Sequence, residues 1–212
     1  MPTPIGHALA GLAVAWSAEP SSKAQSLGRA LARPLTLVCM ALAVLPDLDL
    51  MYPPLHRAAT HSLGATILVT IIGAGVTGWV TGRINWRIAF ICGAAYASQI
   101  VTDWLGTDRN YAPYGIQMFW PFDKGWYTSG WDVFPPVERR NPFSAATIRT
   151  DITAAIREIV ILGSVAAAIW FARKRPLRRD PPSPQRSNTY PRFHGDAGNG
   201  VDGGNGQHGD AE

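Results

Sequence analysis

LGATILVTIIGAGVTGWVTG, residues 63–82, contains no charged side chain. A helix needs roughly 20 mainly apolar residues to cross the hydrocarbon core of a bilayer, so this stretch predicts a transmembrane span. Its glycines and other small residues suit the close helix–helix packing found in lipid. The stretch therefore indicates a membrane protein of the all-α class.

Four further apolar segments flank this one, at residues 5–18, 35–46, 88–106 and 156–172. The first is too short for a full span and lacks the basic start of a signal peptide, so we expect a short or re-entrant helix there. We expect the other three to cross the membrane, with the apolar run 35–46 leading directly into the aspartates that follow it. We predict a multi-span transmembrane helical bundle, with a long loop at the membrane interface and a disordered C-terminal tail.

The chain divides at about residue 173 into a membrane-embedded domain, 1–172, and a basic, then Gly/Pro-rich tail, 173–212. The net charge of +4 owes much to the start of this tail. A basic cluster beside a span is typical of contact with membrane lipids, so we expect no nucleic-acid partner. From Pro176 onward the tail holds few large aliphatic residues, and its ordering entropy would not be offset by burial.

Basic residues next to spans favour the cytoplasmic side of a membrane. If the tail is cytoplasmic, the alternation of spans places the basic stretches 19–34 and 83–87 on the same side. The opposite face then receives residues 47–62 and the aromatic-rich loop 107–157, which we expect to lie as a lid on the lipid headgroups. We therefore predict a multi-pass membrane protein with a cytoplasmic tail.

The segment LPDLDLMYPPLHRAATHS, residues 45–62, concentrates polar side chains between two apolar segments. Asp47 and Asp49 would point about 200° apart on a continuous helix, but the neighbouring prolines favour a break that lets both face one side. The alternative is that one carboxylate caps a helix and the other faces water. Two unpartnered carboxylates at a membrane boundary are costly, which favours a shared ligand.

His56 and His61 are five residues apart, so they do not form the HExxH pair of a zinc protease. They can converge if His56 lies in the loop and His61 begins the next helix. Imidazole and carboxylate ligands together suit Zn²⁺, with Mn²⁺ or Fe²⁺ as alternatives. Arg57 between them suits an anionic substrate group. The other interpretation is two interfacial histidines and a plain interfacial cation, without metal.

Three further residues are candidates of unequal weight. Asp103 ends an apolar segment, and ionisable residues in membrane spans are functional candidates by default. His7 taken alone is more often a core or interfacial histidine, and Asp132 in GWDVFPP is weak alone. The two cysteines, Cys39 and Cys92, lie in apolar runs and are expected to be small buried hydrophobes.

Several short motifs occur in a fixed order: His7 followed by Gly11, LPDLD at 45–49, HRAATHS at 56–62, Asp103, YGIQMFWPF at 114–122 and WD at 131–132. Over roughly residues 1–170 the chain resembles the bacterial membrane-bound metal-dependent hydrolases, the YdjM-like inner-membrane proteins. The resemblance implies a bacterial inner-membrane location and a His/Asp metal site. The ligands that it implies are His7, Asp47, Asp49, His56, His61, Asp103 and, less securely, Asp132. That family usually has glycine after HR, where this chain has Ala58.

Two functions remain open at this stage. The first is a hydrolase that uses a metal-activated water to cleave an ester or phosphoester of a lipid-like substrate at the bilayer surface. Its expected catalytic residues are Asp49, His61 and Arg57, with one or two divalent ions, Zn²⁺ first. The second is a non-enzymatic inner-membrane protein in which a metal or charge network ties the helices together. The sequence leaves the substrate and the oligomeric state open.

Overall fold

The structure is a computed structural model, and it describes residues 2–19, 26–51, 57–106, 112–137 and 144–174. Secondary structure within these ranges is helical, apart from two isolated β-bridges, which confirms the predicted all-α class. The described residues all belong to one compact unit, Met1–Arg175. The second unit, Pro176–Glu212, lies outside the described residues. The predicted disorder of the tail concerns these residues and stays a prediction.

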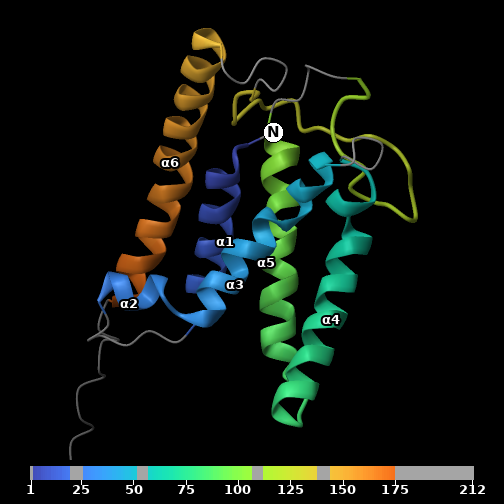
Figure 1. Cartoon of the computed structure of the whole chain (residues 1–212), viewed down its shortest axis with the longest axis vertical. Coiled ribbons are helices and arrows are strands. Elements are labelled where there is room, and N and C mark those ends of the chain that lie inside the picture. The colour runs from blue at the N-terminus through green and yellow to red at the C-terminus, as the bar shows by residue number, and fades with distance from the viewer. Residues whose placement is uncertain (1, 20–25, 52–56, 107–111, 138–143, 175–212) are drawn as a thin grey trace, which may run out of the picture. The chain divides into compact units, whose positions relative to one another are not determined.

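Four helical segments are long and apolar enough to cross a membrane, which confirms the predicted multi-span bundle (Figure 1). They are α3 (Pro34–Val44) with the 3-10 helix that continues it (Leu45–Met51), α4 (Leu63–Thr81), α5 (Trp86–Leu105) and α6 (Ala145–Lys174). Helix α1 (Pro4–Ala18) is shorter, about 22 Å at 1.5 Å per residue, as the sequence predicted. A short α2 (Leu27–Leu31) precedes α3.

Helix α6 begins well before the apolar segment that was expected from residue 156. Ser144 caps its start, because the Thr147 backbone N–H donates to Ser144 Oγ at 3.1 Å. The first turns carry Arg149 and Asp151, so hydropathy alone marks only the later part of the helix. The predicted loop 107–157 therefore extends too far, because its last residues, 145–157, belong to α6. At about 45 Å, α6 exceeds a hydrocarbon core of roughly 30 Å.

Helix α1 contacts α3, α5 and α6, while α4 packs against α5 (Figure 1). Gly11 allows a close approach of α1 to α3, since a Cβ there would lie 2.5 Å from the Cys39 carbonyl oxygen. Small residues serve this purpose in lipid, where close packing drives helix association. Cys39 and Cys92 are buried and free, as expected for small hydrophobes.

The polypeptide changes conformation where the site residues begin. Helix α3 ends at Val44, and residues 45–51 tighten into a 3-10 helix that carries Asp47, which confirms the predicted break near Pro46. A second 3-10 turn, η3 (Ala59–His61), leads into α4. Ser62 caps α4 by accepting from the Ala65 N–H at 3.1 Å.

Residues 112–137 form a loop that is fastened to the ends of two helices. The Leu63 and Gly64 N–H groups at the start of α4 donate to the Met118 and Trp120 carbonyls at 2.8 and 3.1 Å. These bonds satisfy donors that a helix leaves unpaired at its N-terminus. Several aromatic side chains of the loop are exposed, Phe122 most of all at 84%, as an interfacial loop requires. Phe134 is instead buried in the interior of the loop.

Candidate metal centre

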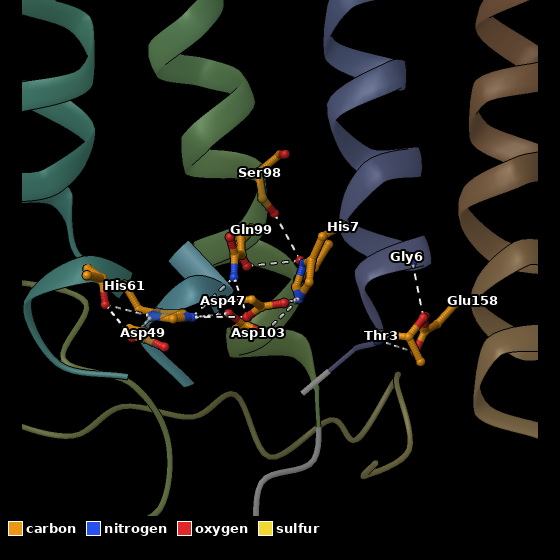
Figure 2. A network of polar contacts seen from close by, with 12 residues as sticks. Thr3, Gly6, His7, Asp47, Asp49, His61, Ser98, Gln99, Asp103 and Glu158 are labelled. Carbon is orange, nitrogen blue, oxygen red and sulfur yellow. Dashed lines mark hydrogen bonds and ion pairs between the residues drawn. The ribbon is translucent and has the colours of Figure 1, made fainter. Parts of the chain in front are cut away.

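Four buried side chains meet where α1 begins and α5 ends (Figure 2). They come from four different elements: His7 from α1, Asp47 from the 3-10 helix after α3, His61 from η3 and Asp103 from α5. Both histidines are 0% exposed, Asp103 is 3% and Asp47 is 8% exposed. We refer to these four residues as the His/Asp ring.

The ring alternates imidazole and carboxylate groups. His7 Nε2 lies 3.7 Å from Asp47 Oδ2 and 3.4 Å from Asp103 Oδ1. His61 Nε2 lies 3.6 Å from Asp47 Oδ1 and 3.4 Å from Asp103 Oδ2. These separations exceed the roughly 2.7–3.2 Å of N–H···O hydrogen bonds. They match the roughly 3.3–3.6 Å between two ligands of one tetrahedral ion whose bonds are about 2.0–2.2 Å.

The hydrogen bonding of His7 determines which nitrogen faces the ring. The Thr102 hydroxyl donates to the backbone carbonyls of Ser98 and Gln99, at 3.1 and 2.9 Å, so it accepts from His7 Nδ1 at 2.9 Å. This contact favours the tautomer with the proton on Nδ1, in which Nε2 presents a lone pair to the two carboxylates. Among the described residues, Nε2 of His7 and both Asp103 oxygens have no hydrogen-bond partner. A lone pair on His7 Nε2 and the carboxylate oxygens repel one another, and a cation shared between them would remove this repulsion.

Asp49 lies beside His61 Nδ1, the imidazole nitrogen on the side away from Asp47 and Asp103, and it orients the imidazole. Asp49 Oδ2 is 3.2 Å from His61 Nδ1 and accepts from the Thr60 hydroxyl at 2.5 Å and the Arg57 N–H at 3.1 Å. A carboxylate that accepts the Nδ1 proton holds the imidazole with Nε2 free for a ligand. Asp49 therefore acts on the His/Asp ring through its contact with His61 and is not itself a member of the ring.

His61 lies outside the candidate spans, in the turn that precedes α4. Burial disfavours its charged form, but hydrogen bonds to Asp47 and Asp49 and the charge of Asp103 raise the pKa of His61 to about 9. Without another cation, protonated His61 thus supplies positive charge to the buried carboxylates at neutral pH. A divalent ion would take over this role.

Gln99 is a site residue that the sequence analysis missed. Its buried amide Nε2 donates to Asp47 Oδ1 at 2.8 Å and lies 3.2 Å from His61 Nε2. Gln99 precedes Asp103 by four residues on α5, so the two side chains share one face. That spacing, an amide one turn before a carboxylate in an apolar span, was a signal available in the sequence.

Glu158 of α6 was also missed, and it anchors the start of α1. Glu158 is 0% exposed and accepts from the Thr3 backbone N–H at 2.9 Å and the Thr3 hydroxyl at 2.5 Å (Figure 2). Thr3 in turn caps α1, the helix that carries His7. A Cβ at Gly6 would lie 2.6 Å from Glu158 Oε2, so a larger residue there would displace the Glu158 carboxylate.

The remaining predicted site residues lie in different surroundings. His56 lies outside the described residues. Arg57 is 7% exposed, with its guanidinium 5.9 Å from the Trp126 ring centroid and a left-handed φ of 66°. Ala58 has a φ of −92°, so the turn does not require glycine at that position. Asp132 is half-buried in the loop and is not a member of the His/Asp ring.

Within the ranges that the structure describes, no group of three or more His, Cys, Asp or Glu side chains lies so that it could hold a metal ion as it stands. The ring residues nevertheless fit a divalent ion. Their nitrogen and carboxylate oxygen atoms face one another in a buried interior, at separations close to those of ligands that share an ion, and His7 Nε2 and the Asp103 oxygens have no hydrogen-bond partner among the described residues.

Comparison with known proteins agrees with this architecture. The family model for the YdjM inner membrane protein matches residues 1–176, a region that includes every element described above. Neither the curated proteins nor the solved structures gave a match. Because the family model covers most of the sequence, this chain belongs to the YdjM inner membrane protein family.

Proposed function

We propose that this protein is a membrane-bound metal-dependent hydrolase whose ion is held by the His/Asp ring. The observation that carries the proposal is His7 Nε2, which faces Asp47 and Asp103 with no hydrogen-bond partner among the described residues while Nδ1 contacts the Thr102 hydroxyl. Two imidazole nitrogens and two carboxylates suit Zn²⁺ first, with Mn²⁺ or Fe²⁺ as alternatives. Asp47 and Asp103 would balance the charge of one divalent ion.

Such an ion, when bound, polarises an ester or phosphoester oxygen and lowers the pKa of a water molecule to about 7. Asp49 retains the Nδ1 proton of His61 and thereby keeps His61 Nε2 directed at the ring. Gln99 holds Asp47 from the opposite side by its amide N–H. These contacts position the donors before an ion binds, which lowers the reorganisation needed during reaction.

A lipid-like substrate is supported by the surroundings of the ring. Exposed apolar side chains lie at this end of the bundle, including Met51 and Leu48 beside Asp47 and Asp49, and Phe122 of the loop. Such a surface suits the boundary between headgroups and acyl chains. The Arg57 guanidinium, adjacent to Trp126, is proposed to hold an anionic group of the substrate.

The orientation proposed here places the tail in the cytoplasm and the His/Asp ring at the opposite face. Arg83 and Arg87, beside the start of α5, lie at the end of that helix away from Asp103. The excess of basic residues at that end supports a cytoplasmic location for it. Labelling of a single cysteine introduced at position 83, in intact cells and in inverted vesicles, tests the orientation. Labelling from outside intact cells would contradict it.

Metal analysis of purified protein tests the proposed ligands. Wild type, His7→Ala and His61→Ala are purified without chelator, and their metal content is measured alongside helicity and elution volume. His194→Ala, which changes a histidine of the tail, is the matched control. We expect both ring variants to lose the metal and the control to keep it. Wild-type protein without metal under several supplied ions would overturn the proposal, and turnover of ester and phosphoester substrates by loaded protein then tests hydrolysis.

A structural metal or charge network is the second candidate function. It is favoured by one observation: both imidazoles of the ring are completely buried, and four elements meet there. In that case the metal raises thermal stability but the loaded protein cleaves no ester or phosphoester. Retention of turnover in a metal-free protein would contradict both candidates.

A further inference from the structure

A groove runs between α1 and α5 at the end of the bundle away from the His/Asp ring. Its volume is about 660 Å³, and its lining includes Val14 and Ser17 of α1 together with Arg87, Phe90 and Ala94 of α5. The groove exists because α1 ends beside the first half of α5 (Figure 1). Since α5 is a candidate membrane span, the groove opens toward lipid.

The lining changes from polar to apolar along the groove. Arg87 lies one residue after the start of α5 and donates from Nη2 to the Ala18 carbonyl at 2.7 Å. This bond uses one of the five N–H donors of a guanidinium. Phe90 and Ala94 follow along α5, so the apolar part extends about 10 Å toward the middle of the bilayer. A phospholipid likewise has a charged headgroup that is followed by hydrocarbon chains.

Positive charge is concentrated around the polar end of the groove. Arg173 Nη2 donates to the Glu19 carbonyl at 2.9 Å, and Arg33 Nη1 pairs with the Glu19 carboxylate at 2.8 Å. With Arg87 on the neighbouring Ala18, three guanidinium groups gather around the end of α1, where these contacts include one carboxylate. This excess favours a ligand with net negative charge.

We propose that the groove binds one anionic glycerophospholipid, with the phosphate at Arg87 and one acyl chain along Phe90 and Ala94. A guanidinium matches a phosphate through paired N–H···O bonds, and the apolar lining needs a hydrocarbon chain that soluble phosphates lack. The proposal is independent of the metal centre, because the groove shares no residue with the His/Asp ring.

Lipid binding is measured by native mass spectrometry and thermal unfolding of the full chain in detergent. The probes are palmitoyl-oleoyl phosphatidylglycerol, the phosphatidylcholine with the same acyl chains, and glycerol 3-phosphate. We expect one tightly bound phosphatidylglycerol per chain and a larger rise in melting temperature than with phosphatidylcholine. Equal effects of the two lipids, or an equal effect of glycerol 3-phosphate, would overturn the proposal.

Two variants change the two parts of the groove separately. Arg87→Gln removes the charge, and Ala94→Phe fills the groove from an exposed position while Arg87 stays unchanged. Each should weaken phosphatidylglycerol binding by about fivefold or more. Arg83→Gln, which changes an exposed arginine outside the groove, is the matched control and should bind as wild type does. Wild-type binding by Ala94→Phe, or equal weakening by Arg83→Gln, would assign the effect to surface charge and refute the site.

Discussion

The two ends of α1 handle charge in opposite ways. At its N-terminal end, Glu158, Asp47 and Asp103 surround Thr3 and His7, and their carboxylates are almost fully buried. At its C-terminal end, arginines bond to the Ala18 and Glu19 carbonyls near the surface of the bundle. The helix dipole favours this distribution of charge at both ends, and at the C-terminal end the ion pair of Glu19 includes an Arg33 side chain that remains 33% exposed. The same dipole therefore supports a cluster of buried carboxylates at one end of α1 and capping by arginines at the other.

The largest effect is expected from the buried end. Asp103→Asn keeps the shape of the side chain but removes a charge that lies 3.4 Å from both His7 Nε2 and His61 Nε2. Metal affinity should fall by more than the roughly 10- to 100-fold seen for residues that only orient a ligand. Because breaking a buried charge pair costs about 3–5 kcal/mol, the free energy of unfolding should fall as well. Metal titration and thermal unfolding in detergent measure the two effects.

Asp123→Asn is the control for this experiment. Asp123 lies in the loop, where the Tyr127 hydroxyl and the Gly125 N–H bond to its exposed carboxylate and lower its pKa. Its replacement should leave metal affinity unchanged. If Asp103→Asn bound metal as tightly as this control, the His/Asp ring would not be the ligand set.

The pH dependence of metal binding sharpens the comparison. The folded pKa of His61, about 9, lies above the ordinary 6.5, so its protonation stabilises the metal-free fold fully below 6.5 and less as pH rises through 9. A metal must displace that proton, and its apparent affinity should rise by about tenfold per pH unit between these values. Titrations at fixed ionic strength test this. An affinity that is flat from pH 6.5 to 9 would mean that His61 releases no proton to the metal.

Two glutamate substitutions, one at each end of α1, compare the stability that the two ends contribute. Glu158→Ala leaves the Thr3 N–H and hydroxyl buried without their acceptor, which should cost about 1–3 kcal/mol of unfolding free energy. Glu19→Ala removes a salt bridge between a Glu19 side chain that is 7% exposed and an Arg33 side chain that is 33% exposed, and because the arginine keeps part of its hydration we expect a loss of about 1 kcal/mol. Thermal unfolding of the two variants ranks them. A larger loss for Glu19→Ala would reverse the distinction drawn between the two ends.

The sequence predicted α4 to within one residue, because residues 63–82 contain no charge and glycine ends the helix. It misplaced the start of α6, because the first turns of that helix are polar. The same error hid Glu158, which sat near the edge of the predicted segment but lies in the middle of the real helix. Helix length is therefore predictable where hydropathy and capping signals end together.

Site residues were predictable to the extent that their chemistry is rare in apolar segments. Asp47, His61 and Asp103 stand out in this way, whereas His7 was singled out only by its order among family motifs. Asp49 was predicted as a ligand from its spacing to Asp47. The direction of its side chain depends on the 3-10 helix, which places the carboxylate beside His61 Nδ1. Backbone conformation of this kind is set by tertiary contacts and cannot be read from spacing alone.

The smallest expected effect concerns Gln99, which touches the ring without belonging to it. Gln99→Leu removes the N–H that holds Asp47 Oδ1, so Asp47 gains freedom and metal affinity should fall by about tenfold. Gln117→Leu is the matched control, because that amide donates to the Lys124 carbonyl in the exposed loop. Metal titration of both variants, with helicity measured in parallel, separates an effect on the ring from an effect on folding. If Gln99→Leu binds metal like the control, Asp47 is positioned by the 3-10 helix alone, and the amide serves only to fill the interior between α5 and the ring.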